Sequence, residues 1–137
     1  MFYVRTISTI TIVLCALSIS TITHANAIET LQNDYHAAGA GPFSAAAGEK
    51  LWKSTYKNAK DGRNRSCQSC HGEDLSASGK HIKTGKVIKP IAPSVNGERL
   101  TDIKFIKKWF KRNCKWTLGR KCTAQEKGDF LEYLRSQ

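Results

Sequence analysis

The sequence has a single methionine, Met1, and therefore offers no thioether side chain in the body of the chain. Acidic residues are also scarce, because 11 Asp and Glu stand against 22 Lys and Arg and give a formal net charge of +11. Without a second methionine, a methionine-ligated metal centre is excluded. The excess of basic residues predicts a positive surface that suits an acidic partner.

Residues 1–27 have the composition of a secretory signal. Arg5 is their only charged residue, an apolar and hydroxyl-rich run follows from Ile7 to Ile22, and Ala25-Asn26-Ala27 forms an A-x-A cleavage site. The Thr and Ser residues dilute the run below the roughly 20 predominantly apolar residues of a membrane anchor. We predict cleavage after Ala27, a periplasmic location and no stable membrane insertion of the cleaved protein.

The 110 residues that remain after cleavage are enough for one small hydrophobic core, so we predict one domain over residues 28–137. Loss of Arg5 lowers the formal net charge from +11 to +10. Nucleic acid is the usual partner of a protein this basic, but export from the cytoplasm makes that partner improbable. An acidic protein is the expected partner.

Cys67-Gln68-Ser69-Cys70-His71 is a C-x-x-C-H motif, which is typical of covalent haem attachment. Two thiols at this spacing add to the two vinyl groups of a haem, and the next imidazole binds the iron. A thioredoxin-type pair needs a βαβ context that the flanking sequence does not show. A zinc site needs a second pair of ligands. The remaining two cysteines are separated by seven residues, which is too many for the usual spacing of such a pair. We predict one haem c, attached by Cys67 and Cys70, with His71 as proximal ligand.

The remaining cysteines are Cys114 and Cys122, because Cys15 lies in the predicted signal. An even pair in an oxidising compartment favours a disulfide. The alternative is two buried free thiols.

Helical periodicity and capping residues predict an all-α domain built around one prosthetic group. A short helix is expected over Ile28–Ala38, and others are expected after caps at Ser44 and Thr101. The capping box from Thr123 to Glu126 predicts the start of a last helix. Residues 58–66 and 76–97 are expected to be loops, the second wrapping the haem edge.

The third of these helices places four residues on one face by steps of three and four: Ile103, Ile106, Phe110 and Asn113. A carboxamide on an otherwise apolar face needs a partner once it is buried. Ferric iron could be that partner, because a neutral amide is a weak ligand that suits ferric better than ferrous iron. Asn113 could instead satisfy main-chain groups near the helix end.

Other candidates for the sixth position on the iron are His36, His81, a lysine and water. A histidine would bind both oxidation states and make a simple electron carrier. The lysines of the third helix, at positions 104, 107, 108 and 111, are expected to be solvated, and a docking surface is the alternative interpretation.

The haem motif is followed by two further segments, Lys83-Thr84-Gly85-Lys86 and Pro90-Ile91-Ala92-Pro93-Ser94. Near the C-terminal end of the chain lie Arg112-Asn113-Cys114 and Gly119-Arg120-Lys121-Cys122-Thr123. Together these segments resemble the SHP-type (sphaeroides haem protein) cytochromes c, and the last two are the most specific. The resemblance covers essentially the whole mature chain.

This resemblance implies a class I cytochrome c fold with His71 and Asn113 as the two axial ligands and a disulfide between Cys114 and Cys122. In the family the asparagine dissociates on reduction, and the ferrous haem then binds O2, NO or CO. Asn113 would thus be the residue on which any catalysis depends. A dihaem cytochrome c is the usual electron partner.

Two functions are therefore expected from the sequence. The first is a gas-binding cytochrome, with nitric oxide dioxygenase or oxygen-reducing activity as a further hypothesis. The alternative is a simple electron-transfer cytochrome in which His81 or His36 lies opposite His71.

Overall fold

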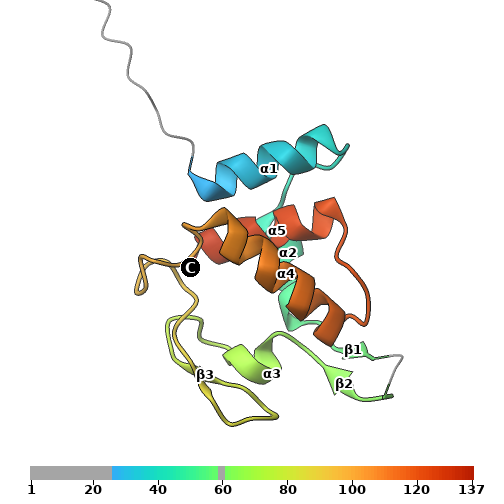
Figure 1. Ribbon diagram of the computed structural model, residues 1–137, viewed down its shortest axis with the longest axis vertical. Coiled ribbons are helices and arrows are strands. Elements are labelled where there is room, and N and C mark those ends of the chain that lie inside the picture. Colours follow the sequence, from blue (N-terminus) through green and yellow to red (C-terminus); the bar gives the residue numbers. More distant parts are fainter. Residues whose placement is uncertain (1–25, 59–60) are drawn as a thin grey trace, which may run out of the picture.

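Helices dominate residues 26–58 and 61–137, which are the residues that the computed structural model describes (Figure 1). The helices are α1 (Ala27–Ala37), α2 (Ala45–Lys53), α3 (Gln68–His71), α4 (Ile103–Thr117) and α5 (Ala124–Arg135). The predicted signal lies outside the described residues except for its last two positions. Among the helices described, none is long and apolar enough to cross a membrane.

Two short antiparallel hairpins accompany the helices. Strand β1 (Tyr56–Lys57) pairs with β2 (Asn64–Arg65), and β3 (Gly79–Lys80) pairs with β4 (Val87–Ile88). The expectation of loops over residues 58–66 and 76–97 was therefore incomplete. Strands of two residues are too short to show the alternation of apolar and polar residues by which a strand is recognised.

The capping residues locate two of the predicted helix starts correctly. Ser44 accepts a hydrogen bond from the Ala47 amide at 3.3 Å, and Thr123 and Glu126 form the expected capping box of α5. The prediction of Thr101 as the cap of α4 was wrong, because α4 is capped by Asp102. The Asp102 carboxylate accepts from two main-chain amides, whereas the Thr101 hydroxyl donates to the Glu98 carbonyl.

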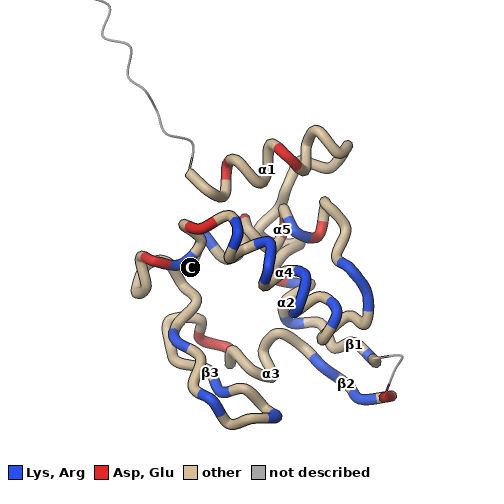
Figure 2. The backbone as a smooth tube through the Cα atoms, viewed as in Figure 1, with Lys and Arg blue, Asp and Glu red and all other residues tan. Residues whose placement is uncertain are grey.

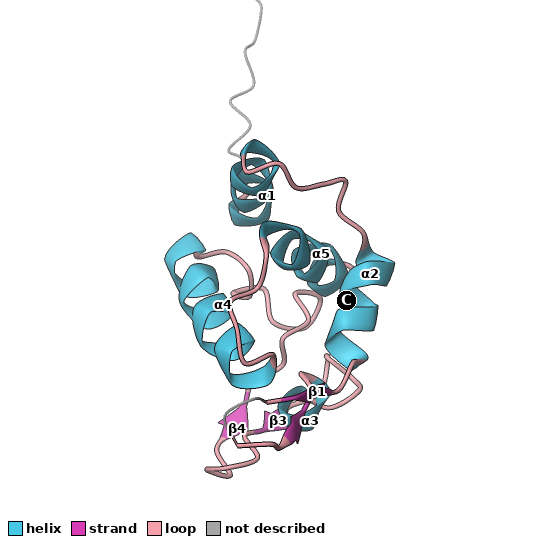
Figure 3. Cartoon of the chain, turned by 90° about the vertical axis from the view of Figure 1, so that its right-hand side faces the viewer, coloured by secondary structure: helices cyan, strands magenta, loops and turns pink. Residues whose placement is uncertain are grey.

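The core lies where α2 and α5 pack together and where α1 covers α5 and α4 (Figures 1 and 3). Trp52, Phe130 and Leu134 belong to the first buried cluster, and Leu31 and Leu131 belong to the second. Helices α2 and α4 lie on opposite sides of the molecule in Figure 3, with α3 and the hairpins below them.

Gly48 sets the closest approach of α2 to α5. A Cβ atom at this position would overlap the main-chain carbonyl of Asp129 and the Tyr133 side chain. We expect Gly48→Ala to lower the free energy of unfolding by about 1–3 kcal/mol, because backbone atoms must move apart. Denaturant unfolding of the haem-loaded protein measures the change.

Gly97→Ala is the matched control for this prediction, because no atom lies within 4 Å of its added Cβ. Its unfolding free energy should stay within about 0.5 kcal/mol of the wild type. Equal stabilities for the two variants would contradict the packing role of Gly48.

Candidate haem site

A cavity of about 1030 Å³ lies between α2, α3, α4 and the β3–β4 hairpin. It exceeds the roughly 300–1,000 Å³ that is usual for small-molecule pockets. Cys67, Cys70, His71 and Asn113 all line it. The structure therefore brings the predicted attachment and ligand residues together around one space, although Asn113 lies more than 40 positions after the other three.

Local hydrogen bonds shape the C-x-x-C-H segment. The Ser66 and Ser69 hydroxyls each accept the other residue's main-chain N–H at 3.1 Å. The Cys67 carbonyl accepts from the His71 amide at 3.1 Å, which closes one helical turn. Residues three apart lie on one side of such a turn. Both thiols consequently face the cavity with the imidazole.

Strand β3 approaches this turn more closely than a side chain would permit. A Cβ atom on Gly79 would overlap the Cys70 carbonyl oxygen. The hairpin after the motif is thus held against α3, and its Val87 and Ile88 complete a wall of the cavity.

His71 has the protonation state that a metal ligand needs. Burial, together with the positive charge of Arg99, lowers the pKa of His71 to about 4. The imidazole is therefore neutral near pH 7 and keeps a lone pair on one nitrogen. Arg99 is itself fixed, because it donates to the carbonyls of Pro90 and Lys89 at 2.9 Å.

Trp52 places a hydrogen-bond donor, its indole Nε1, in the cavity wall beside His71. Its ring centroid lies 5.1 Å from that of His71, and its Nε1 is buried without a hydrogen-bond partner in the described structure. Together with the two thiols, the neutral imidazole and the mostly apolar lining, this donor fits a large, flat prosthetic group with polar edges. The donor set therefore agrees with haem.

The Cys67 thiol does not resemble the reactive thiol of a redox pair. Burial raises the pKa of Cys67 to about 12, so this thiol stays protonated at neutral pH. Reactive C-x-x-C cysteines instead have lowered pKa values. This difference disfavours the thioredoxin-type alternative.

The opposite wall of the cavity comes from α4. Ile106, Phe110 and Asn113 line the cavity together, as the helical spacing predicts. Ile106 also packs in the buried cluster with Ile28 and Leu31 of α1, and an exposed ion pair between Lys107 and Asp34, at 3.1 Å, joins the same two helices. Asn113 thus lies on a helix whose position is set by contacts outside the cavity.

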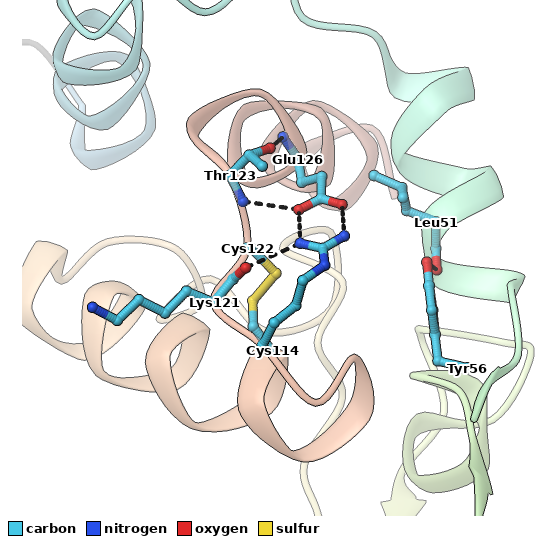
Figure 4. Close-up of a disulfide and its surroundings, with 8 residues drawn as sticks. Leu51, Tyr56, Cys114, Lys121, Cys122, Thr123 and Glu126 are labelled. Atoms are coloured by element: carbon cyan, nitrogen blue, oxygen red, sulfur yellow. Dashed lines mark hydrogen bonds and ion pairs between the residues drawn. A yellow bond between two sulfur atoms is a disulfide. The ribbon is translucent and has the colours of Figure 1, made fainter. Parts of the chain in front are cut away.

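The predicted disulfide between Cys114 and Cys122 is confirmed (Figure 4). It joins the residue after Asn113 to the loop that precedes α5, across a Cα–Cα distance of 5.5 Å. Glu126 accepts two hydrogen bonds from Arg120, at 2.6 and 2.8 Å, and a third from the Thr123 amide. The backbone behind Asn113 is therefore clamped covalently and electrostatically.

Replacing both cysteines by serine, Cys114→Ser with Cys122→Ser, should lower the free energy of unfolding. A bridge over so short a loop contributes roughly 2–3 kcal/mol in the chain-entropy model. For a domain of this size the expected fall in Tm is about 10 °C. Thermal unfolding followed by far-UV circular dichroism measures it, and an unchanged Tm would contradict a stabilising role.

The two histidines considered as alternative ligands differ in position. His36 is not among the residues that line the cavity, and its Nδ1 donates to the Ala40 carbonyl at 2.8 Å. His81 does line the cavity, but its Nδ1 accepts the Thr84 amide N–H at 3.2 Å. The Thr84 hydroxyl lies 3.0 Å from the same Nδ1, so Thr84 orients the ring through this nitrogen and Nε2 is the nitrogen that a metal could contact.

Sequence reasoning missed Arg65, which lies two residues before the haem motif. Its side chain is buried, donates to the Trp116 carbonyl at 2.9 Å and lies 3.8 Å from the centre of the Trp116 ring. It also pairs with Asp61. Arg65 thus connects the motif to the end of α4. Arginine is rarely buried, so nothing in the sequence around Arg65 predicted that its side chain would lie in the interior.

Comparison with known proteins places these features in context. A family model described as a domain of unknown function (DUF1924) matches residues 38–134. The chain is similar to cytochrome c-type protein SHP of Cereibacter sphaeroides, with 42% identity over 103 residues that cover 75% of this chain and 78% of the relative. It is also similar to cytochrome c'' of Methylophilus methylotrophus, with 41% identity over 76 residues that cover 56% of this chain and 53% of the relative.

The solved structures agree with the sequence matches. Oxidised SHP, described as an oxygen-binding cytochrome c, superimposes with a TM-score of 0.72 at 37% identity, covering 83% of this chain and all of that one. Oxidised cytochrome c'' of Methylophilus methylotrophus gives a TM-score of 0.68 at 33% identity, covering 81% and 94%. The mostly helical cytochrome c fold predicted from the sequence is confirmed.

Proposed function

Because the chain belongs to the SHP-type monohaem cytochromes c and to the DUF1924 family, we propose that it is an exported cytochrome that binds O2 after releasing an asparagine ligand on reduction. Membership in the c-type cytochromes implies a covalently attached haem. When bound, that haem supplies an iron that changes oxidation state and accepts small ligands. The observation that carries the proposal is the presence of Cys67, Cys70, His71 and Asn113 on the walls of one cavity.

Each of the four residues has a distinct role in this proposal. Cys67 and Cys70 attach the one haem through thioether bonds, and His71 provides the proximal imidazole. Asn113 provides the distal ligand through its carboxamide. The relative SHP is described as oxygen-binding, and this supports O2 as the ligand of the present protein.

The chemistry of Asn113 explains how the site can open. A neutral amide oxygen is a hard, weak ligand, so the Asn113 carboxamide would hold ferric iron better than ferrous iron. The Cys114–Cys122 bridge holds the adjacent backbone, so only the side chain of Asn113 needs to rotate. Small diatomic molecules, namely O2, NO and CO, would enter the position that it leaves.

Electrons must reach the site from another protein. The positive charge of the chain favours an acidic redox protein, such as a dihaem cytochrome c, as the donor. The electron-carrier alternative with His36 receives less support, because His36 lies outside the cavity, whereas His81 lines it. The carbon monoxide response of the reduced protein tests the His81 alternative.

Visible absorption spectra of the purified haem protein test the proposal. We expect the dithionite-reduced protein to show a high-spin spectrum that shifts at once when carbon monoxide is added. Sharp low-spin bands that ignore carbon monoxide would show a strong distal ligand and would refute the release of Asn113.

A further inference from the structure

The excess positive charge of this protein is confined to one part of the chain. Residues 80–122 contain 13 Lys and Arg but only two acidic residues, Glu98 and Asp102, whereas the rest of the chain contains nine basic and nine acidic residues. This segment therefore carries the whole formal net charge of +11. It comprises the β3–β4 hairpin, α4 and the following loop, where basic residues gather in Figure 2.

Within α4 the basic and aromatic residues form parallel rows. Steps of three and four place Lys104, Lys108 and Lys111 along one line of the helix surface. Phe105, Trp109 and Arg112 form the neighbouring row by the same steps, between the lysines and the cavity-lining face. We call these six residues the α4 rim.

The aromatic row of the α4 rim is ordered by its own contacts. The Phe105 and Trp109 rings meet edge to face with centroids 5.8 Å apart, and the Arg112 guanidinium lies 5.0 Å from the centre of the Trp109 ring. All three residues also line the cavity. The row is thus a preformed border between the haem site and the outer surface.

The lysines of the α4 rim take part in none of the ion pairs between described residues. The only α4 lysine in those pairs is Lys107, which contacts Asp34. Like charges in a row destabilise a helix slightly, and no acidic side chain of the described residues offsets this repulsion by an ion pair. Acidic side chains of another protein would do so.

We propose that the α4 rim is the docking surface for an acidic redox protein. Charge attraction to the lysine row steers the encounter, and the Phe105–Trp109 pair provides an apolar centre for close contact beside the haem site. Trp and Arg are the residues most enriched at such centres. The inference rests on the proposed function, because it presumes electron exchange with another protein.

The β3–β4 hairpin is the competing basic surface. Its exposed apolar residues, Ile82 and Val87, are aliphatic and lie on a hairpin with two-residue strands. The α4 rim instead offers aromatic rings on a helix of 15 residues that also carries Asn113. Docking there places the partner on the helix that carries the proposed distal ligand.

Stopped-flow reduction of the ferric haem-loaded protein by flavodoxin hydroquinone, an acidic one-electron donor, tests this inference. We expect the triple variant Lys104→Gln, Lys108→Gln, Lys111→Gln to be reduced about tenfold more slowly than the wild type at low ionic strength. The difference should vanish at about 1 M salt, where the Debye length falls to about 3 Å. None of these lysines lines the cavity, so haem binding is preserved.

Two charge-matched variants serve as controls. The first removes three lysines of α2 and β1, Lys50→Gln, Lys53→Gln and Lys57→Gln, and α2 lies on the side of the molecule opposite α4 in Figure 3. The second removes three lysines of the competing hairpin: Lys80→Gln, Lys83→Gln and Lys89→Gln. Both should react nearly as fast as the wild type.

Equal slowing of all three variants, or slowing of the hairpin variant alone, would overturn the assignment of the α4 rim. The carbon monoxide test of the α4 variant keeps the two proposals distinguishable. If the α4 variant responds normally to carbon monoxide but is reduced as fast as the wild type, the docking surface is refuted and the release of Asn113 is not. If the α4 variant is reduced slowly and its reduced form does not respond to carbon monoxide, the release of Asn113 is refuted and the docking surface is not.

Discussion

Replacement of Asn113 by histidine is expected to close the reduced protein to carbon monoxide. Asn113 lines the cavity together with His71, and an imidazole at its position would bind both iron oxidation states. If the new ligand occupies the site 99% of the time, the apparent affinity for carbon monoxide falls about 100-fold. Titration of the dithionite-reduced variant with carbon monoxide measures this change.

Two variants make the result specific to the distal position. Asn113→Ala removes the ligand without supplying a stronger one, so its affinity for carbon monoxide should equal or exceed that of the wild type. His81→Ala removes the cavity-lining histidine whose Nδ1 is engaged by Thr84, and it should bind carbon monoxide normally. An unchanged affinity in Asn113→His would place Asn113 away from the sixth position.

The parts of the site that were predictable from sequence are those encoded at short range. Cys67, Cys70 and His71 lie within five residues, so the motif predicts haem attachment without knowledge of the fold. The helical period placed Asn113 on the same face as Ile106 and Phe110, and all three line the cavity. The pairing of Cys114 with Cys122 followed from the compartment and from the lack of other free cysteines.

Features that depend on distant contacts were not predictable. Arg65 meets Trp116 across 51 positions, and the unpartnered indole of Trp52 is recognisable only where α2 adjoins the haem motif. The cap of α4 was misassigned by one residue, because Thr101 and Asp102 both suit that role in isolation. The folded chain distinguishes them, because the Asp102 carboxylate accepts from two main-chain amides whereas the Thr101 hydroxyl donates to the Glu98 carbonyl.

Replacement of Cys67 and Cys70 together by serine is expected to abolish covalent haem attachment. The two thiols lie on one turn that faces the cavity, and serine hydroxyls do not add to haem vinyl groups under the same conditions. Mass spectrometry of the denatured variant should find the chain without haem, whereas the denatured wild type should retain the haem mass. Cys114→Ser with Cys122→Ser is the matched control and should retain it.

Single substitutions separate attachment from cavity shape. Either Cys67→Ser or Cys70→Ser leaves one thiol facing the cavity, so the haem mass should persist after denaturation. In the double variant, the apolar walls and the neutral imidazole of His71 remain, and they should hold haem noncovalently in the folded state. Haem that survives denaturation of the double variant would show attachment elsewhere in the chain and would contradict the assignment of Cys67 and Cys70.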